Sequence, residues 1–231
     1  MPPRLPQGNH SIMVPFIYQI YSQRHQGLAE TSRLILELTG APYENVFVQD
    51  WEKEKGITPL QQTPVLRVFA NGKWEQIAES HAMERCLSQA LGLMGKDALQ
   101  AARMDMYHAA WTDMISLFMW KVWRAPDEES KSRGASEFWV EFPKFLAKHD
   151  SILDKIEGPF YSGLHPSLPD IYAFTWLNRF ITKWLPSPDG LITEENYPHV
   201  WALWNAARQL ERINSYIESG RWNLSFEADQ K

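Results

Sequence analysis

The stretch TPVLRVFANGKWEQIAESHAMERCLSQAL, residues 63–91, decides how the first half of this chain folds. Its first sixteen residues form two short apolar runs that meet at Asn71 and Gly72, the pair that best favours a type I′ turn. The rest places Met83 and Leu87 on one face of a helix. The stretch therefore predicts an antiparallel hairpin that leads directly into a helix.

The residues before this stretch predict a strand, a helix and a second strand. FIYQIY (16–21) and YENVFV (43–48) alternate in polarity, while LAETSRLILELTG (28–40) has apolar residues at helical spacing. A strand–helix–strand crossover implies parallel strands. The resulting order over residues 14–92, βαβ then ββα, is that of a thioredoxin-like domain.

The residues after Lys96 predict only helices, because no alternating run survives there. The charged stretch APDEESKSRGASE (125–137) is expected to separate the first long helix from the next, and Pro143 to kink or interrupt that next helix. The later helices are expected over residues 138–156, 168–181 and 197–218. SLPD (167–170) is the pattern of a capping box.

The sequence thus predicts an α/β domain followed by an all-α domain. Residues 1–13, which are rich in proline, are expected to form a flexible tail. Residues 14–92 are expected to form the thioredoxin-like domain, and residues 97–223 a helical bundle. A chain of 231 residues is long enough for two such domains that share an interface.

Composition excludes several classes of function. A net charge of −5 argues against a nucleic-acid partner, which needs a dense basic surface. The single cysteine, Cys86, rules out an internal disulfide and a CxxC pair, which favours the cytoplasm. No stretch of 18 uncharged apolar residues predicts a membrane span, and the start of the chain does not resemble a signal peptide. The seven histidines show no HxxxH or HExxH spacing, so no metal site is expected.

Three separate segments, in the same order, resemble the cytosolic glutathione S-transferases. They are YSQRHQGLAETSR (21–33), DWEKEKGITPLQQTPVL (50–66) and IAESHAMERCL (77–87), followed by the helical half with SLPD. The resemblance covers residues 16 to about 220. It is closest to the sigma-like pattern, with fungal features in the first loop.

The resemblance implies a set of residues that bind glutathione as co-substrate. Trp51 and Lys55 fall on the W-x-x-x-K pair that contacts the glycyl carboxylate. Glu79 and Ser80 fall on the pair that holds the γ-glutamyl end. Independent physics supports Ser80, because the N–H groups and dipole at a helix N-terminus attract a carboxylate.

The Thr63-Pro64 pair is also part of the resemblance. It implies a cis bond before Pro64, with the backbone of Thr63 offered to the cysteinyl part of glutathione. Only about 5% of Xaa-Pro bonds are cis, so the residues alone do not establish this geometry.

Catalysis in the resembling family depends on a side chain at the end of the first strand that stabilises the glutathione thiolate. An alignment without gaps puts Ser22 at this position, and its neighbour Tyr21 is the alternative. A hydroxyl that donates to sulfur favours the thiolate, which is the nucleophile. Arg24 is expected to add positive potential. Leu28 stands where the sigma pattern has an arginine.

The hydrophobic substrate site is expected on the helix that begins near residue 97. Its apolar residues occupy more than one face, so some should line a cleft rather than the core. The candidates are Tyr107, Trp111 and Met114. Trp222 and Phe226, near the end of the chain, are expected to close over this site.

The expected function is glutathione-dependent attack on a bulky apolar electrophile. The first alternative is cis/trans isomerisation of a conjugated alkene in fungal secondary metabolism, with glutathione returned unchanged. The second is a non-catalytic binding module with the same fold. The resemblance also implies a homodimer.

Overall fold

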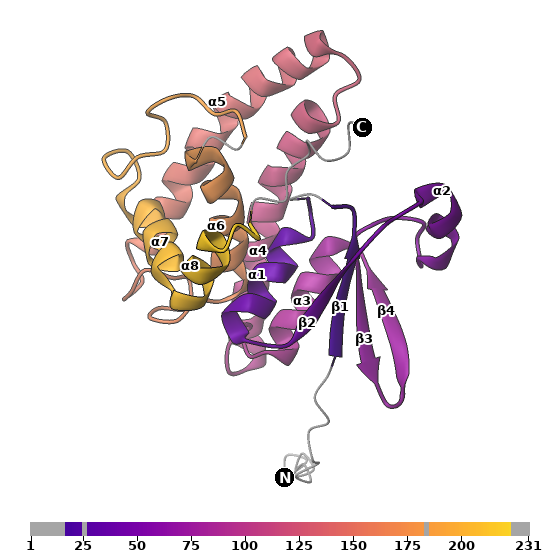
Figure 1. Cartoon of the computed structure of the whole chain (residues 1–231). Helices are drawn as coiled ribbons and strands as arrows, with labels where there is room; N and C mark the ends of the chain where they lie inside the picture. Colours follow the sequence, from indigo (N-terminus) through magenta and orange to yellow (C-terminus); the bar gives the residue numbers. More distant parts are fainter. Residues whose placement is uncertain (1–16, 25–26, 183–184, 223–231) are drawn as a thin grey trace, which may run out of the picture.

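The computed structural model describes residues 17–24, 27–182 and 185–222, which form two packed halves (Figure 1). The first half comprises β1 (Ile17–Ser22), α1 (Glu30–Thr39), β2 (Tyr43–Phe47), α2 (Trp51–Glu54), a 3₁₀ turn (Lys55–Ile57), β3 (Val65–Ala70), β4 (Lys73–Ala78) and α3 (Ser80–Ala90). The second comprises α4 (Ala98–Phe118), a π-helical turn (Met119–Trp123), α5 (Glu128–Leu153), α6 (Leu168–Ile181), α7 (Pro198–Gln209) and α8 (Glu211–Glu218). The predicted fold class is confirmed. The predicted tail, residues 1–13, lies outside the described residues.

The four-stranded sheet has the order β2-β1-β3-β4. β1 is parallel to β2 and antiparallel to β3, and β3 is antiparallel to β4. The hairpin turns at Asn71 (φ +52°) and Gly72 (φ +77°), the two positive values that a type I′ turn requires. Because of these directions, β1, β2 and β4 end at the same edge of the sheet, and β3 begins there.

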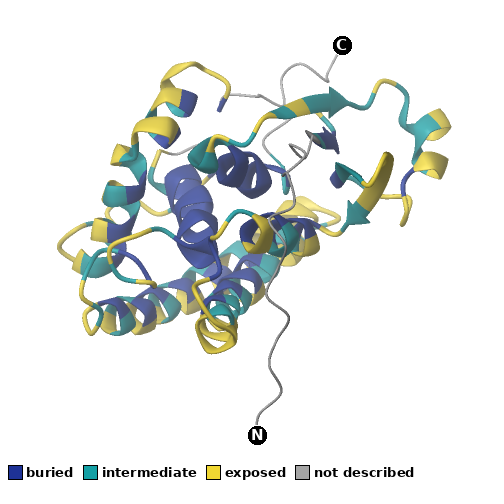
Figure 2. Cartoon of the chain, turned by 90° about the horizontal axis from the view of Figure 1, so that it is seen from below, coloured by how far each residue is buried: buried dark blue, intermediate teal, exposed yellow. Residues whose placement is uncertain are grey.

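Helices α1 and α3 lie on one face of the sheet, between it and the helical half (Figure 1). Behind them, α6 is buried along almost its whole length, and Figure 2 shows such dark blue helices inside a shell with exposed outer faces. The predicted capping box starts α6: the backbone N–H of Ser167 donates to Asp170 Oδ2 at 2.8 Å, and that of Tyr161 donates to Oδ1 at 2.8 Å. This box anchors the central helix.

The charged stretch 125–137 is mostly helical, so the predicted long break is wrong. Asp127 caps α5 by accepting a hydrogen bond from the backbone of Ser130 at 2.7 Å. Glu128 and Glu129 follow in the first turn, where the helix dipole favours negative charge. The charges therefore mark a helix start, and α5 also runs through Pro143 without a break.

The predicted helix over 197–218 is two helices. Leu210 has an extended conformation (φ −61°, ψ 122°) and serves as the C-cap of α7 and the N-cap of α8. Apolar periodicity continues across this residue, so the hydrophobic pattern alone gave no sign of the break.

A buried hydrogen-bonded chain links α4, α5 and the loop before α6. Trp111 Nε1 donates to the Tyr161 hydroxyl at 2.8 Å, and that hydroxyl lies 2.5 Å from His149 Nδ1. Since the indole can only donate, the tyrosine proton is available for His149 Nδ1. Burial lowers the pKa of His149 to about 4, which keeps its imidazole neutral.

We predict that His149→Asn reduces the loss of stability in acid. The pKa of His149 is depressed in the folded state, so the unfolded chain takes up the proton first and wild-type stability falls between about pH 6.5 and 4. The free energy of unfolding of wild type should fall by about 3 kcal/mol more than that of the variant between pH 7 and pH 4. Urea titrations across this range measure the difference, and parallel curves would contradict the prediction.

Candidate active site

A cavity of about 250 Å³ lies between the sheet edge where β1 ends and the helical half. The first half contributes Ser22, Gln23, Gly27, Leu28, Thr63 and Pro64 to its lining. The helical half contributes Phe118, Met119, Trp123, Arg124, Trp176 and Arg179. The cavity thus combines polar groups of the sheet edge with an aromatic wall that carries two arginines.

Ser22 is held by a buried arginine. Its Oγ accepts a hydrogen bond from Arg33 Nη2 at 2.7 Å and donates to the carbonyl of Gln23 at 3.0 Å. Arg33 is fully buried, so this charged donor fixes the serine oxygen in a water-poor environment. The hydroxyl proton can turn toward the cavity without loss of the bond to Arg33.

Arg33 is in turn held by three elements. Its Nη1 donates to Glu30 Oε2 at 2.8 Å and its Nε to Asn45 Oδ1 at 2.8 Å. Glu30, also fully buried, accepts a further hydrogen bond at 2.7 Å from the Tyr216 hydroxyl on α8. The serine is therefore positioned by a network that joins β1, α1, β2 and the end of the helical half.

Tyr21, the alternative to Ser22, does not line the cavity. Its hydroxyl donates to Glu54 Oε2 at 2.5 Å, and its ring packs under the Arg67 guanidinium at 4.3 Å. Burial and the hydrogen bond to Glu54 raise the pKa of Tyr21 to about 12. The tyrosine proton is therefore committed to Glu54, and the residue anchors α2 to the sheet.

The sheet directions gather the other predicted binding residues at one edge. Thr63-Pro64, a cis bond as expected, precedes β3 and lines the cavity. Glu79 and Ser80 follow β4, and α2 follows β2. Glu79 has φ +66°, an unusual value for a non-glycine residue, and its carbonyl accepts the first hydrogen bonds of α3.

Four of the predicted residues lie at this edge but outside the cavity lining. Trp51 is half-buried on α2, and Lys55 pairs with Glu52 at 2.6 Å. Glu79 is exposed and Ser80 is buried at the start of α3. Their predicted roles in binding glutathione remain predictions.

Arg24 is exposed, and its guanidinium lies 4.8 Å from the centre of the Phe47 ring. It is not among the residues that line the cavity. Its expected contribution is therefore limited to the positive potential beyond the end of β1.

The three predicted substrate residues on α4 do not reach the cavity. Trp111 is fully buried in the core, Tyr107 stacks on Tyr161 with ring centres 4.5 Å apart, and Met114 packs against the core. The wall of the cavity comes instead from the end of α4 and from the π-helical turn, Phe118 to Arg124. Periodicity shows that α4 has more than one apolar face but not which of its turns borders the cavity, and the wall begins only at the C-terminal end of α4.

A close backbone contact accompanies this turn. Gly134 of α5 lies so near the turn that a Cβ at this position would be 2.0 Å from the carbonyl oxygen of Lys121. Only glycine allows the two helices to approach in this way. This glycine, inside the stretch expected to be a charged break, is the signal in the sequence for the close approach.

Comparisons with known proteins agree with this fold. A protein-family model, that of the glutathione S-transferase C-terminal domain, matches residues 112–220. The crystal structure of the monomeric Na-GST-3 from Necator americanus superposes with a TM-score of 0.75 at 23% identity, covering 87% of this chain and 96% of that one. The chain has the glutathione S-transferase fold.

Sequence relatives support a place in the glutathione S-transferase superfamily. Hematopoietic prostaglandin D synthase of Mus musculus is 28% identical over 203 residues, which cover 87% of this chain and 94% of that protein. Glutathione S-transferase 4 of Caenorhabditis elegans is 35% identical, over 40% of this chain and 44% of its own length. S-crystallin 2 of Octopus vulgaris is 22% identical over 87% of this chain and 96% of its own.

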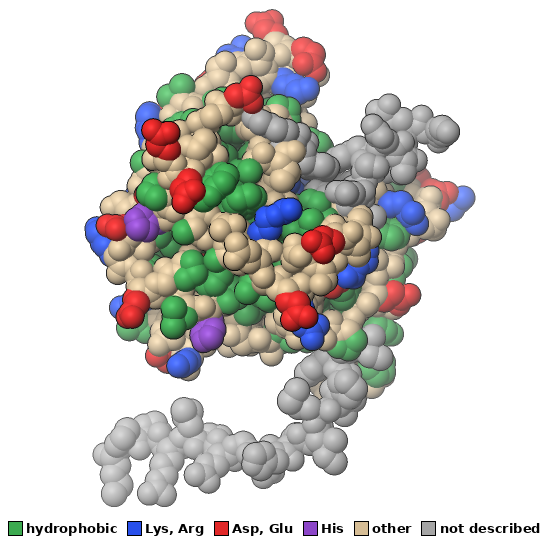
Figure 3. Space-filling view, turned by 60° about the vertical axis from the view of Figure 1, so that its left-hand side comes forward, with side chains coloured by type: hydrophobic (Ala, Val, Ile, Leu, Met, Phe, Trp, Pro, Cys, Tyr) green, Lys and Arg blue, Asp and Glu red, His purple; other side chains and the backbone are tan. Residues whose placement is uncertain are grey.

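The surface of this glutathione S-transferase fold carries mixed charge. Acidic and basic side chains are interspersed on the face shown in Figure 3. None of the helices in the described residues combines the length and apolar character needed to cross a bilayer.

Of the two residues expected to close the site, only Trp222 is among the described residues. Trp222 is buried against Phe174 and Tyr216, with ring centres 6.3 and 6.4 Å away, and does not line the cavity. Phe226 lies outside the described residues. Cys86 is half-buried, and burial raises the pKa of its thiol, which disfavours a reactive thiolate.

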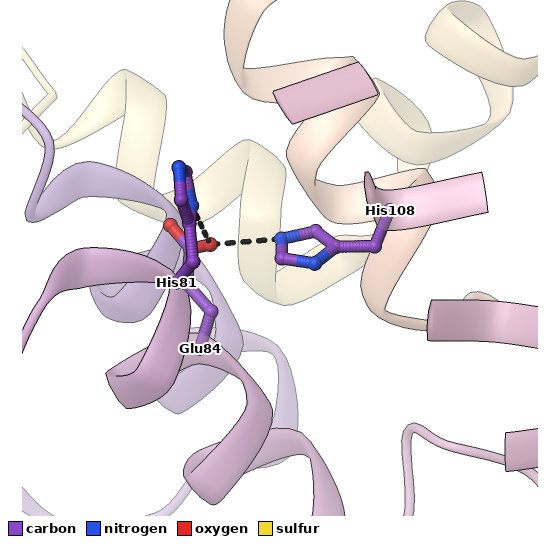
Figure 4. Close-up of side chains that lie close together, drawn as sticks. All are labelled: His81, Glu84 and His108. Carbon is purple, nitrogen blue, oxygen red and sulfur yellow. Dashed lines mark hydrogen bonds and ion pairs between the residues drawn. The ribbon is translucent and has the colours of Figure 1, made fainter. Parts of the chain in front are cut away.

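Two histidines and a glutamate meet where the two halves join (Figure 4). Glu84 Oε2 lies 3.1 Å from His81 Nδ1 on α3 and 2.9 Å from His108 Nε2 on α4. Burial alone would raise the pKa of Glu84, but these hydrogen bonds outweigh it and hold the pKa below its usual value. The three ligand atoms lie within 4.8 Å of one another, so they could share a metal ion. As drawn, the shared carboxylate oxygen already joins the two histidines.

We predict that substitutions at Trp111 and Trp123 reduce the free energy of unfolding by different amounts, because Trp111 belongs to the core and Trp123 to the cavity wall. Trp111→Ala should cost about 3–5 kcal/mol of unfolding free energy, because it leaves a buried cavity and removes the donor to Tyr161. Trp123→Ala, at a residue 42% exposed, should cost less than about 1 kcal/mol. Urea denaturation measures both values. Equal losses would show that Trp123 belongs to the core.

Proposed function

We propose that this protein is a glutathione transferase that directs the thiolate of glutathione at a bulky apolar electrophile. The observation that carries the proposal is that Ser22 and Thr63-Pro64 line the same cavity as the aromatic residues Phe118, Trp123 and Trp176. A polar edge for a peptide and an apolar wall for a second substrate are what such a reaction requires. The names of the relatives are consistent with this activity.

In this proposal the sheet edge holds the tripeptide. The backbone of Thr63 pairs with the cysteinyl residue, and Trp51 and Lys55 contact the glycyl carboxylate. Glu79 and Ser80 hold the γ-glutamyl end, where the N-terminus of α3 favours its carboxylate. Fixing glutathione at both ends leaves its sulfur near the end of β1, and such positioning supplies much of the rate.

The proposed catalytic group is the Ser22 hydroxyl. Donation from Oγ–H to the sulfur favours the thiolate over the thiol, which lowers the pKa of bound glutathione. Arg33 polarises this hydroxyl through its 2.7 Å bond to Oγ and adds positive charge behind it. Tyr21 is the weaker candidate, because its proton is donated to Glu54.

We predict that Ser22→Ala lowers kcat/KM on the order of 100-fold with glutathione binding largely retained, as for loss of one anion-stabilising donor. The apparent pKa of the rising limb of the pH–rate profile should also increase, toward the pKa of a free thiol, about 8.5. Stopped-flow rates with 1-chloro-2,4-dinitrobenzene from pH 5.5 to 9 measure both effects. Ser22→Thr, which keeps a hydroxyl, is the matched control.

Tyr21→Phe tests the alternative group. It should leave the pH–rate limb in place and weaken glutathione binding, because the hydrogen bond that anchors α2, with Trp51 and Lys55, is lost. If Tyr21→Phe moves the limb and Ser22→Ala does not, the catalytic assignment is wrong. If the wild-type protein shows no calorimetric uptake of glutathione, the proposed function fails altogether.

Isomerisation is a second candidate, supported by the same cavity. A thiolate that adds to a conjugated alkene turns the double bond into a single bond, which rotates before elimination restores free glutathione. A fungal biosynthetic enzyme of this kind would give a product with the mass of its substrate. We predict that mass spectrometry of turnover mixtures shows either the mass of the conjugate or an unchanged mass with a new retention time.

A non-catalytic binding module with the same fold is the contrasting proposal. The buried Arg33–Ser22 pair supports catalysis instead, because a docking surface gains nothing from a polarised hydroxyl in a cavity. Cytoplasmic location and a homodimer accompany the proposal. Capture on glutathione resin and light scattering test the binding and the assembly.

A further inference from the structure

The cluster of His81, Glu84 and His108 is built from both halves of the chain, and none of its members lines the cavity beside Ser22 (Figure 4). His81 and Glu84 stand three residues apart on α3, which puts them on one face of that helix. His108 comes from α4 and points its Nε2 at the same carboxylate oxygen. No HxxxH or HExxH spacing announces this set, because its third member belongs to a different helix.

The distances within the cluster suit a transition-metal ion. Glu84 Oε2 lies 3.1 Å from His81 Nδ1 and 2.9 Å from His108 Nε2, and the three atoms lie within 4.8 Å of one another. A tetrahedral zinc ion with ligands at about 2.0–2.2 Å holds those ligand atoms about 3.3–3.6 Å apart. Small rotations of the three side chains are therefore enough to place such an ion between them.

A buried nitrogen of His108 points to a ligand independently. Its Nδ1 has no hydrogen-bond partner among the described residues, although His108 is fully buried. An ionised carboxylate only accepts, so a ring that donates from Nε2 to Glu84 leaves Nδ1 as a bare acceptor. The Asp105 carboxylate, a second acceptor, lies 3.9 Å from this nitrogen. The hydrogen-bonded arrangement thus buries an acceptor that faces an anion.

A metal ion on His108 Nε2 removes this conflict. The ring proton then resides on Nδ1, on the side of Asp105. Histidines that bind metals usually donate their other ring N–H to a carboxylate in this way. Arg85 on α3 donates from its Nε to Asp105 Oδ1 at 2.5 Å, which holds that carboxylate in place. The partner that a metal-bound His108 requires is therefore already positioned by the neighbouring helix.

The surroundings of the cluster give an ion both access and shelter. Both imidazoles pack against the Tyr172 ring of α6, with ring centres 5.7 and 5.0 Å away. The side chains of Glu84 and His108 are 1% and 0% exposed, whereas that of His81 is 32% exposed. An ion can therefore enter beside His81, where water can supply a fourth ligand.

We propose that His81, Glu84 and His108 bind a divalent transition-metal ion of the zinc class, which ties α3 to α4. Two imidazoles and one carboxylate suit zinc, whereas magnesium and calcium prefer sites made of oxygen ligands. Because α3 belongs to the first half and α4 to the second, the ion is a structural link between the halves. It takes no part in the proposed transfer reaction. Since the ion binds only the folded chain, it raises the free energy of unfolding by mass action.

The first test counts zinc ions on the full chain, prepared without an affinity tag and stripped of metal by a chelator that is then removed. Competition with a chromophoric chelator should show one tightly bound zinc ion per wild-type chain and none in His81→Ala. Asp105→Asn should weaken the affinity about 10- to 100-fold, the usual effect of removing a carboxylate behind a metal-bound histidine. His199→Ala is the matched control. His199 pairs with Asp154 at 3.1 Å and belongs to no three-ligand cluster in the described residues, so its loss should leave zinc binding unchanged.

Two further measurements report the geometry and the structural role. Cobalt(II) in a tetrahedral site absorbs visible light, so its band should appear with wild type and be absent with His81→Ala. Zinc chloride should raise the thermal unfolding midpoint of wild type and of His199→Ala and leave that of His81→Ala unchanged. Magnesium chloride should shift none of them. Each variant is compared with itself with and without metal, so a less stable variant still gives an answer.

A folded wild-type protein that binds no zinc would overturn the inference. So would one zinc ion bound equally well by His81→Ala. A loss of affinity in His199→Ala as large as that in His81→Ala would also overturn it, because it would indicate adventitious binding by surface histidines. None of these results bears on the proposed transferase, since calorimetry measures glutathione binding separately.

Discussion

The buried pair between Arg33 and Glu30 is the interaction on which the site depends. Two ions removed from water are costly unless their remaining donors and acceptors are satisfied. Here Asn45, Ser22 and Tyr216 supply those partners, from β2, β1 and α8. Because the buried charges need all of these partners, the network fixes α1, β1, β2 and α8 relative to one another. Ser22 is one of the groups that complete it.

The directions of the strands are the second constraint on the site, and most of these directions could be predicted from the sequence. The alternating runs and the Asn71-Gly72 turn were sufficient to predict the strands, and the crossover helix α1 made β1 and β2 parallel. From these directions alone, the ends of β1, β2 and β4 must meet the start of β3. The gathering of Ser22, Thr63 and Ser80 at one edge is therefore a consequence of local signals.

The helical half was harder to predict, because its structure depends on the conformation of single backbone positions. The π turn at Met119–Trp123 changes which of its own side chains face the cavity, and Trp123 lies on the wall. Trp111, which precedes this turn, lies in the core. An extended Leu210 divides a helix whose apolar pattern is continuous. Periodicity reports which residues are apolar, whereas these positions depend on packing against a second element. By contrast, Arg33 and Arg179 stand out as charges inside apolar helices and could have been found, since such residues are seldom fully buried without a partner.

The two buried arginines place positive charge beside the cavity. Arg33 lies behind the serine and Arg179 across from it, and each disfavours the charge of the other, as the influence of Arg33 on the pKa of Arg179 indicates. The carboxylates of Glu30 and Glu84 oppose this repulsion and favour the charged form of Arg179. Both guanidinium groups would attract an anion formed in the cavity. The thiolate proposed beside Ser22 would be such an anion.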